Sequence, residues 1–212
     1  HEVFGIEKEA FYPVGMPRMD GFLDPEVIDA FKDDFYTKYP ELQEKKVILF
    51  APTYRGAEQK YAYYDYSKLD FQRIYEFCQK EDAVFLIKMH PFVKTLPEIP
   101  ELLQDRIWEF SRFPDINKLY YVTDLLITDY SSNYFEYALL QRPVVFYTYD
   151  REFYELTRGV HRSILESAPG KVCDTFDQLM ECLEQKDFET ENRKKFCGRT
   201  ILADIAAMHR IG

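Results

Sequence analysis

The sequence predicts an α/β fold built on a Rossmann-like, doubly wound parallel sheet. Two observations support this prediction: short apolar segments recur along the 212 residues, and stretches with helical periodicity lie between them. Repeated strand-then-helix order favours right-handed crossovers, which place helices on both faces of a mostly parallel sheet. The length suits one such domain, and we find no internal repeat or linker.

The strand candidates are short and largely apolar along their whole length, which is typical of strands buried on both faces. The four principal candidates are residues 47–51, 84–89, 124–128 and 143–147. Residues 106–110 and 171–173 are weaker candidates. We therefore expect a sheet with these segments as its strands.

Helical patterns lie before, between and after these segments. We predict helices at residues 25–39, 67–80, 114–121, 132–140, 151–156, 175–185 and 188–208. We predict irregular structure for residues 158–170. The alternation of the two patterns is what a doubly wound sheet requires.

The composition allows a full core, because 46% of the residues are hydrophobic and 17% are aromatic. With 27 Lys and Arg against 37 Asp and Glu, the formal net charge is −10. An acidic surface argues against general nucleic-acid binding, which needs a basic footprint. It is compatible with a small anionic ligand, because a pocket can be locally positive on an acidic protein.

The four cysteines are scattered and form no C-x-x-C pair, which argues against structural zinc and a disulfide framework. Reduced thiols in the cytosol fit this pattern better. No apolar run approaches the roughly 18–20 residues of a membrane span. Since the chain starts with His1 in sequence typical of a domain interior, we expect it to be a piece of a longer protein.

Polar residues directly follow the four principal strand candidates. In a doubly wound sheet, ligands bind beyond the carboxyl ends of the strands, so these residues are the first candidates for a site. In chain order, the strand-end residues are Thr53, Arg55, His90, Asp129, Ser131, Ser132 and Asp150. The sequence therefore brings polar side chains to one edge of the sheet.

Two serines, Ser131 and Ser132, stand at the start of the predicted helix 132–140. A helix start has unpaired N–H groups and partial positive charge, so with serine hydroxyls it can bind phosphate. The alternative is a plain N-cap at Ser132 or Asn133, with Glu136 completing a capping box. The residues alone leave both interpretations open.

His90 follows a strand and precedes a proline. It can donate to a diphosphate or protonate a leaving group, or it can be a structural histidine bonded to a neighbouring carbonyl. Thr53 and Arg55 can form a basic turn over a phosphate or an ordinary solvated loop. Arg18, which follows a Gly-x-Pro turn, has the same two interpretations.

Several common catalytic signatures are absent from the sequence. We find no G-x-G-x-x-G, no Walker lysine motif, no H-E-x-x-H and no G-x-S-x-G. This argues against a dinucleotide oxidoreductase, a P-loop kinase, a zinc protease and an α/β-hydrolase.

Taken in order, the strand-end motifs resemble the CDP-glycerol glycerophosphotransferase family. This family contains teichoic-acid primases and polymerases, with related CDP-ribitol transferases and capsule polymerases. The resemblance covers about residues 3–160 with the spacing intact. It rests on GMPRMD (15–20), VILFAPTYRG (47–56), LIKMHP (86–91), TDLLITDYSSNYFEYALLQRPVVFYTYD (123–150) and the RG at 158–159.

The resemblance implies a GT-B architecture of two Rossmann-like halves, of which residues 1–212 look like the carboxyl-terminal, CDP-alcohol-binding half. The amino-terminal acceptor half is then absent from this chain. The implied partners are CDP-glycerol or CDP-ribitol, that missing half, and a lipid-linked polyol-phosphate or glycan acceptor. No cofactor or metal is implied. The implied location is cytoplasmic, with the parent peripheral on the inner face of the bacterial membrane.

The resemblance also implies roles for individual residues. His90 corresponds to the family histidine that engages the diphosphate, and it is the catalytic candidate. The nucleotide-binding candidates are Arg18, Thr53, Arg55, Asp129, Ser131, Ser132, Glu136 and Arg158, with Asp129 expected to hold the serine turn in shape. Near the end of the chain, Asp204-Ile205 stands where the family often has Asp-Gly.

The implied reaction is in-line attack of an acceptor hydroxyl on the β-phosphorus of the CDP-alcohol, with CMP leaving. Positioning and charge stabilisation dominate such chemistry. One alternative is a GT-B half of a nucleotide-sugar glycosyltransferase or epimerase. Another, of a different class, is a nucleotide-binding module without catalysis of its own.

Overall fold

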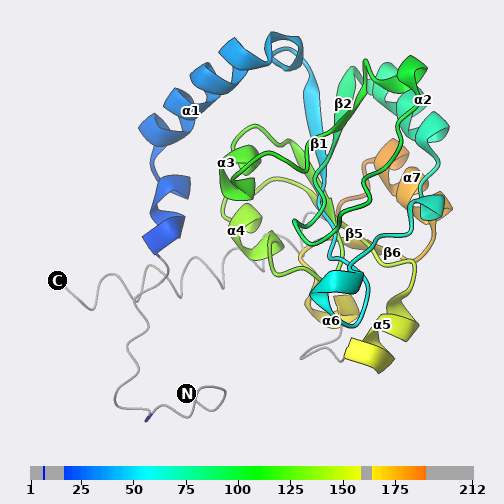
Figure 1. The fold of residues 1–212 in the computed structure, drawn as a ribbon. Helices are drawn as coiled ribbons and strands as arrows, with labels where there is room; N and C mark the ends of the chain where they lie inside the picture. The colour runs from blue at the N-terminus through cyan, green and yellow to red at the C-terminus, as the bar shows by residue number, and fades with distance from the viewer. Residues whose placement is uncertain (1–6, 8–16, 159–163, 190–212) are drawn as a thin grey trace.

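The strands form one fully parallel sheet in the part of the chain that the computed structural model describes, which comprises residue 7, residues 17–158 and residues 164–189 (Figure 1). The sheet has six strands in the order β3-β2-β1-β4-β5-β6. Their bounds are β1 Lys46–Phe50, β2 Ala83–Ile87, β3 Ile107–Glu109, β4 Leu125–Thr128, β5 Val144–Tyr147 and β6 Lys171–Cys173. This confirms the predicted doubly wound α/β fold, including the two weaker strand candidates.

The order in which the chain adds strands to the sheet reverses beside β1. From β1 the chain moves outward to β2 and β3, and then it returns to place β4 on the other side of β1. In open α/β sheets, ligands bind where the strand order reverses, outside the carboxyl ends of the strands. The turns after β1 and β4 therefore flank the point where this fold favours a site.

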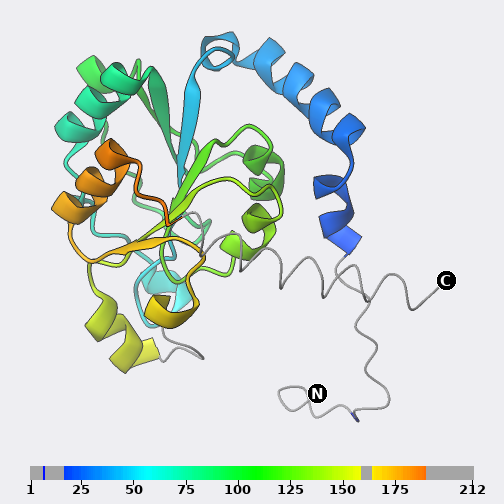
Figure 2. The same cartoon turned by 180° about the vertical axis from the view of Figure 1, so that it is seen from behind.

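The helices lie on both faces of the sheet. Their bounds are α1 Pro25–Lys38, α2 Phe71–Glu81, α3 Ile116–Tyr120, α4 Tyr134–Ala138, α5 Arg151–Arg158, α6 Ile164–Ser167 and α7 Phe176–Gln185. In the two opposite views, α2 and α7 cover one face, while α3 and α4 cover the other, with α1 beyond them (Figures 1 and 2).

Local sequence signals explain where the longer helices begin. Asp24 caps α1 by accepting from two backbone N–H groups, and Pro25 occupies the first turn. Asp70 caps α2 by accepting from the Arg73 N–H. A capping box formed by Thr175 and Gln178 starts α7.

Three helix predictions need correction or fall outside the described residues. The helix predicted over 132–140 is only five residues long and starts at Tyr134. Part of the region predicted as irregular, 158–170, contains the short helix α6. The helix predicted at 188–208 lies almost wholly outside the described residues.

The core consists of two layers, because successive residues of a strand point to opposite faces. Ile48, Phe50 and Phe85 face the layer beneath α2 and α7. Val47 and Leu49 face the layer that contains α3 and α4. Burying each such side chain contributes about 1.5–3 kcal/mol, so these layers hold the strand ends in a fixed arrangement. None of the described helices is long and apolar enough to cross a membrane.

Candidate functional site

A buried arginine joins the turns at the carboxyl ends of three neighbouring strands. Arg55, after β1, is only 6% exposed. Its Nη1 donates to Asp129 Oδ2 at 2.8 Å and to the Thr53 carbonyl at 2.6 Å. Its Nε and Nη2 donate to the two carboxylate oxygens of Asp150, at 2.6 and 2.9 Å. These bonds occupy four of the five N–H groups of the guanidinium.

Aromatic rings surround this ion-pair network. The Arg55 guanidinium carbon lies 5.3–5.5 Å from the ring centroids of Tyr64, Tyr130, Tyr149 and Tyr154. Tyr130 and Tyr154 stack with centroids 3.8 Å apart. Such rings exclude water and favour the cation over their faces, which strengthens the charge interactions inside.

Charge pairing outweighs burial at Arg55. Burial alone lowers the pKa of this guanidinium, but Asp129 and Asp150 oppose burial and hold the pKa above its usual range. Burial raises the pKa of the Asp129 carboxyl, against the opposing effect of Arg55 and the Thr53 N–H. We expected Arg55 to contact a phosphate directly. In the structure its guanidinium is committed to protein acceptors, and this geometry points to a role in shaping the turns.

Asp129 shapes both turns at the strand reversal. Its Oδ1 accepts from the backbone N–H of Thr53, after β1, and from that of Tyr130, after β4, each at 2.7 Å. The side chain is fully buried. A single carboxylate therefore ties the β1 turn to the β4 turn. Thr53 Oγ1 is buried beside this link.

The serine turn precedes α4 and does not form its cap. No side-chain hydrogen bond caps this helix at Asn133, so the capping box with Glu136 does not form. Asn133 instead donates to the Ala51 carbonyl at 3.1 Å and accepts from Thr128 Oγ1 at 3.1 Å. This bridge between β1 and β4 is the physical reason that the helix begins at Tyr134.

The serine turn presents unused hydrogen-bond donors. Ser131 is half-buried and Ser132 is exposed. The Ser131 hydroxyl oxygen accepts from the Asn133 N–H at 3.4 Å. Within the described residues, the backbone N–H groups of Ser131 and Ser132 have no hydrogen-bond partner, and neither does the Ser132 hydroxyl. Two N–H groups and two hydroxyls at one turn can together bind an anionic oxygen.

His90 lies in the turn after β2, beside the β1 turn. Its Nδ1 accepts from the Phe92 N–H at 3.2 Å, so the neutral ring carries its proton on Nε2. The ring packs against Phe92 and Tyr54, with centroid distances of 4.4 and 5.0 Å. Burial, together with Lys88, lowers the pKa of His90. The uncharged histidine thus presents an Nε2–H donor.

The structure gives a defined place to two further charged residues. Asp150 was among the strand-end candidates, although no role was assigned to it, and the structure pairs it with Arg55. Lys88 lies within a predicted strand, and nothing in the sequence indicated that it is buried near His90. It is 8% exposed, donates to the Ser111 carbonyl at 3.1 Å, and has its pKa lowered by burial.

The remaining predicted site residues are dispersed or not described in full. Glu136 is buried on α4. Arg18 lies in the 3-10 helix Pro17–Phe22, and Arg158 is the last residue of α5. The side chains of these two arginines are outside the described part of the structure. Among the described residues there is no group of His, Cys, Asp or Glu that could hold a metal ion.

Comparison with known proteins gives consistent matches. A family model described as CDP-glycerol:poly(glycerophosphate) glycerophosphotransferase matches residues 1–204. Among individual relatives, the teichoic acid poly(ribitol-phosphate) polymerase of Bacillus spizizenii is 42% identical over 195 residues, covering 92% of this chain and 31% of the relative. The teichoic acid ribitol-phosphate polymerase TarL of Staphylococcus aureus is 40% identical, covering 90% of this chain and 34% of the relative.

A structure of the wall teichoic acid polymerase TagF superimposes with a TM-score of 0.78 and 26% identity, covering 97% of this chain and 51% of that chain. The chain thus spans about a third of the length of these two curated relatives. It spans about half of the solved polymerase chain.

Removing the cation of the buried network should greatly lower the stability of the protein. We expect Arg55→Met to lower the free energy of unfolding by about 3–5 kcal/mol, because it leaves two carboxylates without their buried partner. Urea denaturation measures this. The matched control is Arg73→Met, which removes an exposed arginine paired with Asp177. Equal losses in the two variants would contradict a special role for the Arg55 network.

The environment of His90 predicts its titration. NMR titration should give a pKa below the ordinary 6.5. Because the unfolded chain then binds this proton more readily, His90 contributes stability above pH 6.5 and loses it as the pH falls through the folded pKa. A pKa above 6.5 in the ligand-free protein would contradict the neutral Nε2–H form.

Proposed function

Because the chain belongs to the CDP-glycerol:poly(glycerophosphate) glycerophosphotransferase family, we propose that it is the donor-binding part of a polyol-phosphate transferase. The donor is a CDP-alcohol, and the acceptor is a hydroxyl of a teichoic-acid or capsule-type polymer. One observation carries the proposal: the serine turn at the strand reversal has unpaired N–H groups, and a buried network holds it in place. This is a geometry that favours a diphosphate.

In this proposal the serine turn binds the diphosphate through the N–H and hydroxyl groups of Ser131 and Ser132. Arg55 and Asp129 position the turn without contacting the ligand. Arg18 and Arg158 supply positive charge from outside the turn. Thr53 and Glu136 contact the nucleotide.

The reaction is an in-line displacement at the β-phosphorus. An acceptor hydroxyl oxygen forms a bond to that phosphorus, while the bond to the bridging oxygen breaks and CMP leaves with that oxygen. The acceptor proton passes to a base. His90 donates through Nε2–H to the diphosphate and stabilises charge on the departing CMP. Most of the catalytic effect is then positioning and charge stabilisation.

The alcohol in the donor is ribitol rather than glycerol in our proposal. The relatives described as ribitol-phosphate polymerases are 40–42% identical to this chain. A glycerol-phosphate primase of Bacillus spizizenii and a poly(glycerol phosphate) polymerase of Staphylococcus epidermidis are 35% and 31% identical. We therefore favour CDP-ribitol, with CDP-glycerol as the second candidate.

The complete reaction needs more than this chain in our proposal. The relatives are two to three times as long as this chain. We propose that a second half supplies the acceptor site and the base that activates the hydroxyl. The acceptor is lipid-linked, and the whole protein works at the inner face of the bacterial membrane. A nucleotide-sugar enzyme and a non-catalytic nucleotide-binding module are the alternatives. The titration described next tests the first of them.

Donor specificity is tested by calorimetric titration of the protein with four ligands. We expect binding of CDP-ribitol and CDP-glycerol, weaker binding of CMP, and no measurable binding of UDP-N-acetylglucosamine, because the CDP-alcohol engages both the nucleotide and the diphosphate contacts. The variant His90→Gln should bind the CDP-alcohols more weakly. A preference for the UDP-sugar would overturn the proposal in favour of a nucleotide-sugar enzyme.

The serine turn is tested by Ser131→Ala and Ser132→Ala. Each substitution should weaken CDP-alcohol binding by about 1–3 kcal/mol, because each removes a charge-assisted hydrogen bond to the diphosphate. The affinity for CMP, which lacks the β-phosphate, should fall less in these variants. The matched control is Ser67→Ala, which removes an exposed hydroxyl bonded to Asp65. Unchanged affinity in both turn variants would refute diphosphate binding at this turn.

A further inference from the structure

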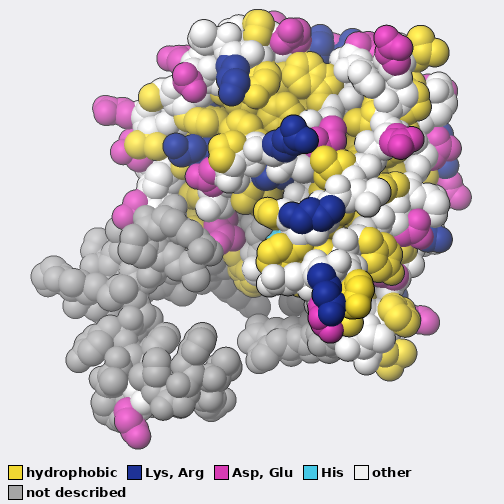
Figure 3. Space-filling model, in the orientation of Figure 1, with side chains coloured by type: hydrophobic (Ala, Val, Ile, Leu, Met, Phe, Trp, Pro, Cys, Tyr) yellow, Lys and Arg dark blue, Asp and Glu magenta, His cyan; other side chains and the backbone are white. Residues whose placement is uncertain are grey.

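Lys88 is the buried lysine among the residues that the structure describes. On the face shown in Figure 3, Lys and Arg side chains lie at the surface among acidic and hydrophobic ones, whereas Lys88 is only 8% exposed. Within the described chain it forms no ion pair, and its side chain makes one hydrogen bond, from Nζ to the Ser111 carbonyl. Buried lysines are rare and are normally paired, so this one needs an explanation.

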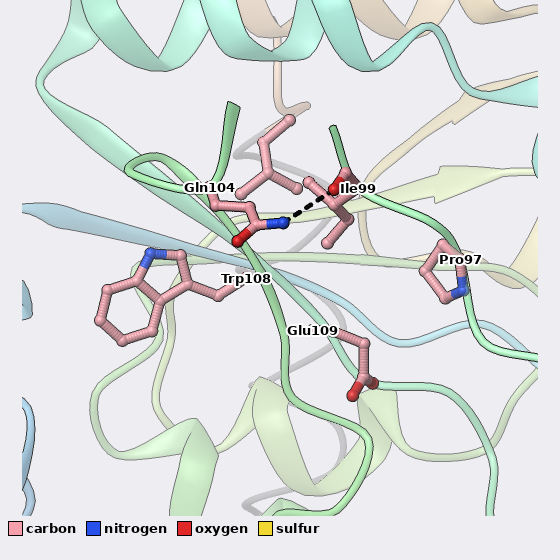
Figure 4. Close-up of a pocket in the computed structure, with 6 residues that line it drawn as sticks. Pro97, Ile99, Gln104, Trp108 and Glu109 are labelled. Atoms are coloured by element: carbon pink, nitrogen blue, oxygen red, sulfur yellow. Dashed lines mark hydrogen bonds between the residues drawn. The ribbon is translucent and has the colours of Figure 1, made fainter. Parts of the chain in front are cut away.

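Two carboxylates favour the charge of Lys88, although within the described residues neither forms an ion pair with it. Glu109 is aligned with Ile87 across the parallel strands, so its side chain points to the face of the sheet opposite that of Lys88, the next residue. There Glu109 lines a hollow of about 290 Å³ beside β3 (Figure 4). Asp115 accepts from the Asn117 N–H at the start of α3.

Burial outweighs the two carboxylates at Lys88. It opposes the charge more strongly than Glu109 and Asp115 favour it, so the pKa of Lys88 lies below its ordinary 10.5. Since the folded state then binds this proton more weakly than the unfolded chain does, the charged lysine lowers stability below pH 10.5. A residue that lowers stability beside a candidate site is more typical of a functional position than of a packing position.

The hydrogen bond of Lys88 belongs to a link that holds the β2 turn. Ser111, in the segment after β3, accepts from Lys88 Nζ through its carbonyl at 3.1 Å and from the Met89 N–H through its hydroxyl at 2.9 Å. Met89 directly precedes His90. Ser111 therefore ties down both residues that lead into His90, on the side of the turn that faces β3.

The charge of Lys88 also acts on His90. Burial lowers the pKa of His90, and Lys88 lowers it further. The groups that pack against the imidazole are the rings of Tyr54 and Phe92. Lys94, on the same turn, is exposed and donates to a backbone carbonyl at 3.0 Å, so water screens its charge.

The charge state of His90 decides how its ring is held. In the neutral ring Nδ1 accepts from the Phe92 N–H, and Nε2 carries the proton. A second proton can bind only at Nδ1, which turns this acceptor into a donor and breaks the hydrogen bond to Phe92. A positive charge that disfavours this second proton therefore keeps the ring oriented.

We propose that Lys88 is a positioning residue for His90, on which it acts through Ser111 and through its own positive charge. Through Ser111 it holds the turn, and through its charge it preserves the hydrogen bond from the Phe92 N–H to Nδ1. Together these effects keep the Nε2–H donor in one direction. This inference rests on the proposed function, because it assigns to that donor the diphosphate of the CDP-alcohol as its target.

The effect of the charge is tested on the ligand-free protein by NMR titration of His90 in Lys88→Met. We expect the pKa of His90 to rise toward its ordinary 6.5 without exceeding it, because the effect of burial remains. The matched control, Lys94→Met, removes the same charge from an exposed position on the same turn and should leave this pKa unchanged. An unchanged pKa in Lys88→Met, or an equal rise in both variants, would overturn the inference.

The effect on binding is tested by calorimetric titration with CDP-ribitol and CDP-glycerol at pH 8, where the imidazole is neutral in all variants. Lys88→Met should bind at least about threefold more weakly, because the turn loses an anchoring hydrogen bond. Its melting temperature should be unchanged or higher, since a buried charge is removed. Lys88→Arg, which keeps the charge and a donor, should restore part of the affinity.

A second variant separates the anchor from the charge. Ser111→Ala removes the acceptor of the Met89 N–H and keeps the charge of Lys88, so it should weaken CDP-alcohol binding while leaving the pKa of His90 unchanged. Wild-type affinity in Ser111→Ala would show that the turn is not held through Ser111, against the inference.

Two further results would also count against the inference. A lower melting temperature in Lys88→Met together with unchanged affinity would make Lys88 a structural residue. If the wild type binds no CDP-alcohol, the proposed function fails and the diphosphate is not the target of the donor. The ligand-free titration of His90 keeps this failure apart from a failure of the Lys88 effect itself.

Discussion

The buried ion pairs of Arg55 are the interaction on which the candidate site depends. The guanidinium binds carboxylates that follow β4 and β5, and it belongs to the turn that follows β1, so it fixes three strand ends at once. Four aromatic rings around the guanidinium exclude water from it. Because a buried charge without a partner is costly, the folded state is stable only while both carboxylates are present. Asp129 extends this order to the backbone by holding the Thr53 and Tyr130 N–H groups.

This arrangement explains how an acidic chain can offer an anion site. Arg55 pairs with both carboxylates, Asp129 and Asp150, and so offsets part of their negative charge beside the site. The donors that remain are neutral N–H and hydroxyl groups at the serine turn, together with the Nε2–H of an uncharged His90. Neutral donors held in place can stabilise a diphosphate without the cost of reorganising around it.

Much of the fold could be predicted from the sequence, because strands buried on both faces leave continuous apolar runs. The ends of β1, β2, β4 and β5 differ from those of the predicted segments by at most about two residues. The start of α4 could not be predicted in this way, because it depends on a hydrogen bond from Asn133 to Ala51, 82 positions away in sequence. The strand-end rule correctly indicated which turns meet. The commitment of Arg55 to Asp150, 95 positions later, depends on the order of strands in space and leaves no local signal. Lys88 was hidden for a similar reason, since its partner, Ser111, follows a different strand.

The central claim is that a buried network keeps the Ser131 and Ser132 N–H groups free to bind a diphosphate. Backbone amide NMR during titration with CDP-ribitol tests it most directly. The account predicts that the amide protons of Ser131 and Ser132 shift downfield and become protected from exchange on binding, while that of Thr53, already bonded to Asp129, changes little. Binding that leaves both serine amides unchanged, with the largest shifts far from the β1 and β4 turns, would contradict it.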